Sequence, residues 1–470
     1  MTGDGRFRLG TGAGFSADRL DPAVDLIRDG ELDAIVFECV GERTLAFGHR
    51  DRMADPAKGY NPLLERRLRA VLPGCIANGT TLITNMGVAN PNAAASRAVE
   101  VARDLGLWGR KIAAVGGDDV SALITDDTEL DQPGLRVVDV GRNMVGANAY
   151  LGVEAVLPAL EAEADVIITG RVADPSLFLA PLCHTFGWRP DDWATLGAGT
   201  LVGHLMECAA QVTGGYFADP GRKDVANLAY VGFPIAEVDP DGGAVITKLE
   251  RAGGEVSERT VKEQLLYEVH DPSAYLTPDV TADFSQVTLE PAGDQRVRIS
   301  GASGSKRPDH LKVTVAFDGG FLAEAGVSYA GPGAGRRAML ARDILEERMT
   351  RLHGSDVPLR LDLIGQSSLH ATASDAVTAG DAVTAGDTVT AGGTGVALPI
   401  DELFDVRVRA ALRSDRRDTA ELLLWEVESL LCCGPAGGGG FRGQITPSVV
   451  THSTYIERDR IQPTLRLVET

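Results

Sequence analysis

The sequence is poor in positive charge. Its 470 residues include 45 Lys and Arg against 66 Asp and Glu, which gives a formal net charge of −21 at pH 7. Binding to a phosphate backbone requires a basic surface, so we expect no nucleic-acid partner, and anionic membranes would be repelled. An anionic ligand would instead be held by a few local groups, such as an arginine or the N-terminus of a helix.

The chain also lacks long apolar runs and paired cysteine motifs. No run reaches the roughly 20 apolar residues of a membrane helix, and no charged-then-apolar leader opens the sequence. We therefore expect a cytoplasmic protein that does not enter membranes. The six cysteines form no C-x-x-C pair, which excludes a zinc ribbon and an iron–sulfur signature. We predict neither a resident metal nor a cofactor.

Three common enzyme motifs are absent or broken. The sequence contains no G-x-x-x-x-G-K-[ST] and no G-x-S-x-G, which argues against a P-loop ATPase and an α/β-hydrolase. The first glycine-rich loop fails the dinucleotide fingerprint, because Phe15 stands where the third glycine is required. Glu38 could still imitate the acid that binds ribose in such sites, so nicotinamide binding remains an alternative.

What is present is an alternation of strand-like and helix-like segments. Short, mostly apolar runs read as buried strands at 7–9, 33–37, 81–84, 111–115, 136–140 and 166–168. A capping residue followed by proline is expected to open helices at positions 21–22, 61–62, 90–91 and 174–175. We predict an α/β fold with a largely parallel, Rossmann-like sheet flanked by helices.

The pattern changes after about residue 225. Shorter strands with glycine-rich turns are expected at 244–248, 287–289, 296–299 and 311–317, with a helix at 336–351. We therefore predict two domains: residues 1–225, an α/β domain with the active-site loops, and residues 226–470, a mixed α+β domain. Copies of the unit AVTAGD fall within 375–393, and we expect a flexible repeat loop over 371–397.

The stretch from 164 to 217 is the most informative for function. Arg171 and Asp174 follow the expected strand 166–168, and in open α/β sheets such loops line the ligand crevice. Asp174 with Pro175 also has the pattern of a helix cap, which leaves a structural role open. His204 and Glu207 form an H-x-x-E pair that would share one helix face and could act as an acid/base pair.

Other strand ends supply further candidates. Glu42 follows the second expected strand and is a candidate catalytic carboxylate, while Asn85 and Asn90 follow the third strand. A guanidinium together with such amides could bind a carboxylate or a thioester carbonyl. The alternative for Asn90 is that it caps a helix.

Three more residues are candidates for substrate binding. Gly12 and Gly14 lie in the first glycine-rich loop, which follows an expected strand. Lys248 follows a later strand and could reach an anionic ligand, such as a phosphate of coenzyme A. A solvated turn lysine remains the alternative for Lys248.

Several segments, taken in order, resemble the AtuA family of acyclic terpene utilisation proteins over nearly the whole chain. They include TGAGFSADRLDPA, TNMGVANPNAAA, ADVIITGRVADPSLFLAPL, GHLMECAAQVTGGYF and TVKEQLLYEVHDPSAYLTPDV. The resemblance implies a bacterial protein associated with the degradation of branched terpenoid acids through acyl-CoA intermediates. The family's first loop commonly reads GASGFWGD, whereas this chain has a different loop from Gly12 to Asp18. Many members continue into a small ferredoxin-like domain beyond the point where this chain ends, so we expect self-assembly or a small partner subunit.

These observations lead to one principal hypothesis and two alternatives. The principal hypothesis is an enzyme of branched or unsaturated acid or acyl-CoA metabolism, a hydratase, dehydratase or lyase that acts next to a carboxylate or thioester. Arg171 would bind the substrate, Asp174 or Glu207 would act as base and His204 as acid. The alternatives are a nicotinamide-dependent oxidoreductase and a non-catalytic subunit that needs a small partner. We expect a homo-oligomer that binds a small-molecule carboxylate or acyl-CoA.

Overall fold

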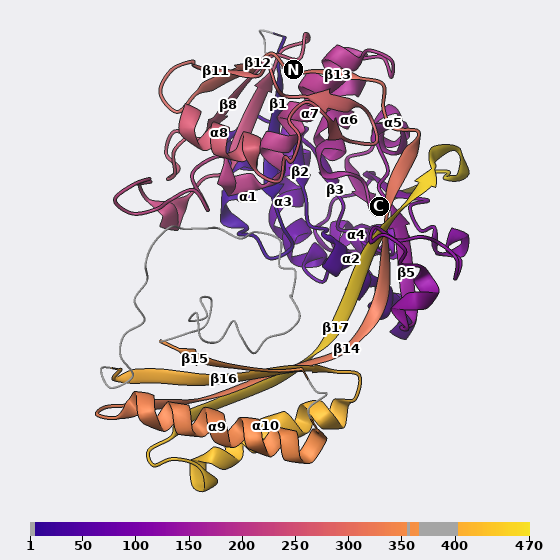
Figure 1. The fold of residues 1–470 in the computed structure, drawn as a ribbon. Coiled ribbons are helices and arrows are strands. Elements are labelled where there is room, and N and C mark those ends of the chain that lie inside the picture. The colour runs from indigo at the N-terminus through magenta and orange to yellow at the C-terminus, as the bar shows by residue number, and fades with distance from the viewer. Residues whose placement is uncertain (1–4, 355–357, 366–402) are drawn as a thin grey trace. The chain divides into compact units, whose positions relative to one another are not determined.

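The computed structural model describes residues 5–354, 358–365 and 403–470. Its contacts divide the chain into two compact units, Met1–Phe317 with Val450–Thr470, and Asp318–Val449 (Figure 1). The expected repeat loop at 371–397 lies outside the described residues. Among the residues that are described, no helix combines the length and apolarity needed to cross a membrane.

The first unit is built on a ten-stranded mixed sheet with a parallel centre. Five strands run parallel in the order β1-β2-β3-β6-β4, and antiparallel strands extend the sheet beyond β1 and beyond β4. The central strands are β1 (Phe7–Ala13), β2 (Ala34–Phe37), β3 (Thr81–Thr84), β4 (Lys111–Gly116) and β6 (Val166–Thr169). The antiparallel strands are β7 (Pro234–Val238), β8 (Ala244–Lys248), β11 (Thr288–Pro291), β12 (Val297–Ser300) and β18 (Thr464–Glu469).

Helices cover both faces of this sheet because its central strands are apolar on both sides. Along β2, Ile35 and Phe37 pack with α1, α3 and α4, whereas Val36 points to the opposite core beneath α5, α6 and α7. The helices of the first unit are α1 (Asp21–Asp29), α2 (Glu42–Ala54), α3 (Leu64–Asn78), α4 (Pro91–Asp104), α5 (Val153–Glu161), α6 (Asp174–Phe186), α7 (Trp193–Glu207) and α8 (Glu258–Leu266).

A small sheet and one separate strand complete the first unit. The small sheet has the order β13-β10-β9, from Ser303–Ser305, Thr281–Asp283 and Tyr275–Leu276. The expected strand at 136–140 is wrong: Val137–Val140 form a 3-10 turn, in which Asp139 bonds back to the Arg136 backbone. The strand lies later, at β5 (Met144–Ala149), where it pairs with the start of β14.

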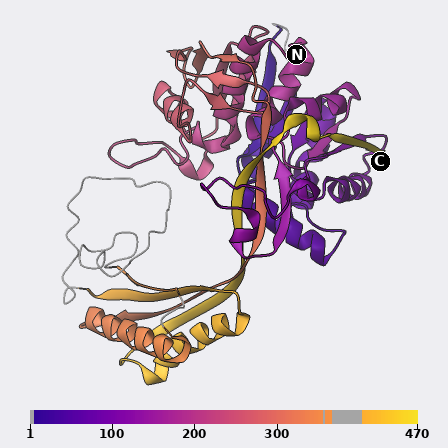
Figure 2. The same ribbon diagram turned by 45° about the vertical axis from the view of Figure 1, so that its right-hand side comes forward.

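The second unit contains four strands and two helices in the order βαββαβ. The elements are β14 (His310–Ala330), α9 (Ala334–His353), β15 (Leu359–Ile364), β16 (Asp405–Ser414), α10 (Arg417–Cys433) and β17 (Gly439–Glu457). The sheet order β15-β16-β14-β17, with α9 and α10 on one face, is that of a ferredoxin-like split βαβ motif (Figures 1 and 2). This chain therefore contains a ferredoxin-like motif, contrary to the expectation that such a domain would lie beyond its last residue.

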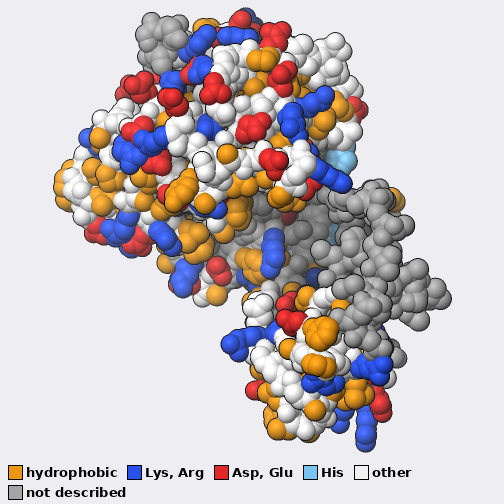
Figure 3. Space-filling model, turned by 90° about the vertical axis from the view of Figure 1, so that its left-hand side faces the viewer, with side chains coloured by type: hydrophobic (Ala, Val, Ile, Leu, Met, Phe, Trp, Pro, Cys, Tyr) orange, Lys and Arg blue, Asp and Glu red, His pale blue; other side chains and the backbone are white. Residues whose placement is uncertain are grey.

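The division into units differs from the expected boundary at 225/226. Residues 226–317 belong to the first unit because β7, β8, β12 and β11 continue the sheet that begins with β1. The long strands β14 and β17 each begin in one unit and end in the other, so the expected short strand at 311–317 is only the first part of β14. On the face drawn in Figure 3, acidic and basic side chains are interspersed.

Candidate functional site

Polar residues from several loops of the first unit line one cavity of about 730 Å³. Gly14 follows β1, Glu38 and Glu42 follow β2, and Arg171 and Asp174 follow β6. The strands β1, β2 and β6 are parallel members of one sheet, and β3 lies between β2 and β6. Their carboxyl ends therefore lie along one edge of the sheet. The C-terminal end of α7 and the residues Tyr150, Glu268 and Lys312 also contribute to the polar part of the lining.

Arg171 is the buried cation of this cavity. Its side chain is 3% exposed, and its Nη1 donates to Asp174 Oδ1 at 2.9 Å and to the Val40 carbonyl. The guanidinium carbon lies 4.0 Å from the centre of the Tyr150 ring, a cation–π contact. The turn between β6 and α6 is held by Asp118, whose Oδ2 accepts a hydrogen bond from the Arg171 backbone N–H at 2.7 Å.

Asp174 is not the cap that the Asp-Pro pattern suggested. The helix α6 begins at Asp174 itself, the preceding Ala173 is the N-cap, and no side chain caps that helix. The carboxylate instead accepts from Arg171 and lines the cavity. Burial raises the pKa of Asp174 above its ordinary value, against the opposing charge of Arg171.

The pKa values of two carboxyl groups that follow β2 are shifted in opposite directions. Glu38 is 8% exposed, and burial, aided by the charge of Asp174, raises its pKa to about 8. Burial would also raise the pKa of Glu42, but a 2.6 Å hydrogen bond from Tyr150 and the charge of Arg171 outweigh it and lower this pKa to about 2. One cavity thus holds a neutral carboxyl group and a carboxylate at neutral pH.

Glu207 and His204 form the expected pair at the end of α7. His204 Nδ1 lies 3.2 Å from Glu207 Oε1, and its Nε2 lies 3.3 Å from the Leu265 carbonyl oxygen. A carbonyl oxygen can only accept, so Nε2 is the donor in the contact with Leu265. Burial raises the pKa of Glu207 to about 7, against the opposing effect of His204. His204 itself is buried behind Glu207, stacked on Phe284.

Two buried polar atoms in the lining have no partner among the described residues. They are Arg171 Nε and Glu207 Oε2. Buried polar groups in proteins are nearly always hydrogen-bonded, so each of these two atoms needs a partner that the described residues do not supply.

Four of the predicted substrate-binding residues lie outside the lining. Asn85 donates to Glu38 at 2.9 Å and accepts from the Cys39 N–H at 2.7 Å, so it holds Glu38 in place. Asn90 caps α4 by accepting from the Ala93 N–H and donates to two backbone carbonyls.

The other two have structural partners as well. Gly12 faces the ring of Phe37, which lies 2.4 Å from where a Cβ atom would stand. Lys248 is 7% exposed and donates to the Ala252 carbonyl at 2.7 Å. Gly14 does line the cavity, and there a Cβ atom would meet the Cys208 backbone at 2.5 Å. The glycines of the first loop are therefore explained by close packing within the protein.

Sequence reasoning missed Tyr150 and Lys312 as site residues. Tyr150 follows β5, and its backbone N–H donates to the Lys312 carbonyl at 2.9 Å, where β5 pairs with β14. Lys312 Nζ lies 3.4 Å from Glu42 and 4.9 Å from the Tyr150 ring centre. The pairing of strands distant in sequence brings this second cation to the cavity, and no local motif marks it.

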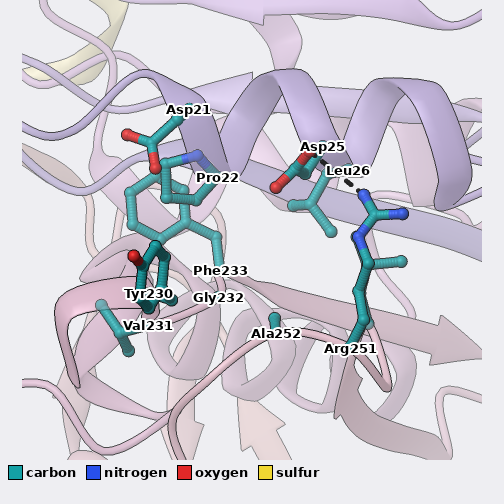
Figure 4. Close-up of a pocket in the computed structure, with 11 residues that line it drawn as sticks. Asp21, Pro22, Asp25, Leu26, Tyr230, Val231, Gly232, Phe233, Arg251 and Ala252 are labelled. Carbon is teal, nitrogen blue, oxygen red and sulfur yellow. Dashed lines mark ion pairs between the residues drawn. The ribbon is translucent and has the colours of Figure 1, made fainter. Parts of the chain in front are cut away.

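A second cavity, of about 240 Å³, lies between α1 and the segments around 230–233 and 249–252 (Figure 4). Arg251 points toward Asp25, at 3.1 Å, and also pairs with Asp29. The one arginine of this lining is thus paired with carboxylates of α1. Among the described residues, no group of three His, Cys, Asp or Glu side chains is placed to hold a metal ion.

Comparison with known proteins gives one match. A family model described as acyclic terpene utilisation family protein AtuA matches residues 7–467. No curated protein and no solved structure matches the chain.

Proposed function

The chain belongs to the AtuA family of acyclic terpene utilisation proteins, and we propose that it is an enzyme that moves a proton next to the carboxylate or thioester carbonyl of a branched or unsaturated acid. The reaction class is hydration, dehydration or C–C lysis. These reactions share one requirement, which is a base and an acid placed beside a carbon made acidic by a polarised carbonyl.

The observation that carries the proposal is that Arg171 and Glu207 line one cavity and each keep a buried polar atom with no partner among the described residues. Arg171 Nε offers a donor and Glu207 Oε2 offers an acceptor, and both are buried. A carboxylate or carbonyl oxygen would satisfy the arginine, while the proton to be moved would lie toward Glu207. Lys312 supplies a second cation at the cavity for the anion to approach.

The acidities in the cavity suit proton transfer. Glu207, with a pKa of about 7, can take a proton from carbon and return it near neutral pH, and its Oε1 lies 3.2 Å from His204 Nδ1. In the exchange step the C–H bond breaks, its electron pair moves into the enolate, and the proton passes to a carboxylate. Asp174 is the second candidate base, and Glu42 remains ionised beside Tyr150.

Deuterium exchange tests the proposal without knowledge of the reaction direction. The protein is incubated in D₂O with branched enoic acids and their CoA thioesters, and mass spectrometry follows the deuterium gained on the carbon next to the carbonyl. Glu207→Gln should lower the exchange rate by about 10² to 10⁴-fold, the usual worth of a positioned acid or base. Asp174→Asn should also lower it if Asp174 is the base.

Glu237→Gln is the matched control, because Glu237 is a buried carboxylate that does not line the cavity and pairs with Arg296. That variant should keep its exchange rate. Wild-type rates in Glu207→Gln and Asp174→Asn together would refute the proposal. Fluorescence titration with NADH tests the oxidoreductase alternative, which tight binding of NADH would favour instead.

A further inference from the structure

A third cavity, smaller than the polar one, adjoins it. It measures about 300 Å³ and shares three lining residues with the larger cavity, namely Tyr150, Asp174 and Lys312. All of its lining residues belong to the first unit. We call this smaller cavity the annex, and we define it by Pro175, Tyr275, Leu276, Leu311 and Tyr455 together with the three shared residues.

The annex differs from the polar cavity in chemistry. Its own lining is mostly aliphatic, aromatic and proline, whereas the polar cavity is lined by several carboxyl groups and Arg171. Leu276 is 66% exposed and Tyr455 is 63% exposed. Apolar side chains left open beside a concave, mostly apolar surface are typical of a ligand site.

We propose that the annex binds the apolar chain of the substrate whose carboxylate or thioester lies in the polar cavity. This inference rests on the proposed function and deepens it by naming the residues that select the chain. The three shared residues fix the direction, because a ligand with its anionic end between Arg171 and Lys312 passes Tyr150 to reach Leu276 and Leu311.

The size of the annex sets the length of chain that it accepts. A methylene group occupies about the volume of a water molecule in the liquid, about 30 Å³, so the annex holds roughly ten carbon-sized groups. A chain that fills it is therefore medium in length, and longer chains would extend into solvent past Leu276 and Tyr455.

A series of carboxylates measures this selectivity directly. Isothermal titration calorimetry of the full chain with butanoate, hexanoate, octanoate and decanoate should show affinity rising by up to about fourfold for each methylene group buried. The enthalpy of binding should become more negative as temperature rises, the mark of apolar burial.

The double variant Leu276→Gln/Tyr455→Ser replaces the two exposed apolar side chains of the annex, which we call its rim, without adding charge. We expect it to lower decanoate affinity by about tenfold or more, because the rim contacts are lost, and to leave butanoate affinity unchanged. Leu340→Gln is the matched control, since Leu340 is an exposed leucine, 52% exposed, on α9 and outside the annex.

The outcomes separate the two proposals. Affinity that is independent of chain length, or equal effects of the rim variant and Leu340→Gln, would overturn the annex proposal and leave the proposed function standing. Binding that grows with chain length but is unaffected by Arg171→Lys would place the carboxylate elsewhere, which overturns both. Failure of every carboxylate to bind would overturn the annex proposal, and the deuterium-exchange experiment with CoA thioesters would still decide the proposed function.

Discussion

The carboxyl group of Glu38 makes the stability of the first unit depend on pH. Burial raises its pKa from 4.5 to about 8. Because the folded pKa lies above the unfolded one, the folded state holds the extra proton, and the stabilisation is complete below about pH 4.5. It is lost as the pH rises through about 8, and a shift of this size corresponds to at most about 5 kcal/mol.

The substitution Glu38→Gln isolates this effect. Oε1 of Glu38 accepts from the Val40 N–H at 2.8 Å and from Asn85 Nδ2 at 2.9 Å, and the amide oxygen of glutamine can accept both bonds. The variant cannot ionise. Its free energy of unfolding should equal that of the wild type within about 1 kcal/mol at pH 5 and exceed it by about 3 to 5 kcal/mol at pH 9.

Urea denaturation followed by tryptophan fluorescence measures the difference. Trp108, Trp188 and Trp193 lie in the first unit, and Trp425 lies in the second. A Trp425→Phe background therefore confines the signal to the unit that contains Glu38. Trp425 is 73% exposed, so its replacement leaves the core of the second unit intact.

Glu237→Gln serves as the control with the opposite sign. Burial raises the pKa of Glu237, but the pairing with Arg296 outweighs it and lowers that pKa below its ordinary value. The variant should therefore be less stable than the wild type by a nearly constant amount between pH 5 and pH 9. Parallel stability curves for wild type and Glu38→Gln over that range would refute the reasoning about Glu38.

Two further substitutions test the cavity itself. Tyr150→Phe removes a hydrogen bond that lowers the Glu42 pKa, so the Glu42 pKa followed by NMR titration should rise by about one unit; an unchanged pKa would refute the role given to Tyr150. Gly14→Ala places a Cβ atom 2.5 Å from a backbone carbon at the end of α7, which should cost about 1 to 3 kcal/mol in thermal unfolding. Gly41→Ala, with nothing within 4 Å, should cost much less.

The central strands could be predicted because their signal is local. The runs Ala34–Phe37, Thr81–Thr84 and Val166–Thr169 are short, almost wholly buried and bounded by polar residues, which is how a strand covered on both faces reads. Proline at the first turn correctly marked the starts of α1, α4 and α6. The family resemblance is confirmed by a match over residues 7–467.

Other elements carried no such signal. The buried face of helix α2 consists of Leu45, Ala46, Gly48 and His49. Because two of these four residues are not apolar, the sequence lacks the apolar repeat of about 3.6 residues that marks an amphipathic helix. In β14 the sequence Asp318-Gly319-Gly320 looks like a turn, yet the strand continues through it. Gly319 is required there because the backbone of Ser448 and Val449 lies within 3 Å of a Cβ position.

The site residues divide in the same way, into those that their own segment predicts and those that long-range strand pairing brings to the cavity. Arg171 and Asp174 were predicted because the strand-end rule depends only on the segment that contains them. Tyr150 and Lys312 reach the cavity through the antiparallel pairing of β5 with β14, which are more than 150 residues apart at Thr314 and Asn148. A pairing over such a distance is decided by tertiary packing, so a single sequence does not encode it in any readable pattern.

Two of the Asx-Pro sequences show why a motif alone cannot assign a role. Asn90-Pro91 and Asp174-Pro175 look alike, but Asn90 caps its helix while Asp174 bonds Arg171 three residues before it. The difference arises because the turn before α6 is already held by Asp118, which accepts the Arg171 N–H. The Asp174 carboxylate is thereby released from capping and lies at the cavity, where its charge is balanced by the guanidinium that a substrate anion would also need. A ligand that replaced Asp174 as the acceptor of Arg171 Nη1 would leave the Asp174 carboxylate free to accept a proton.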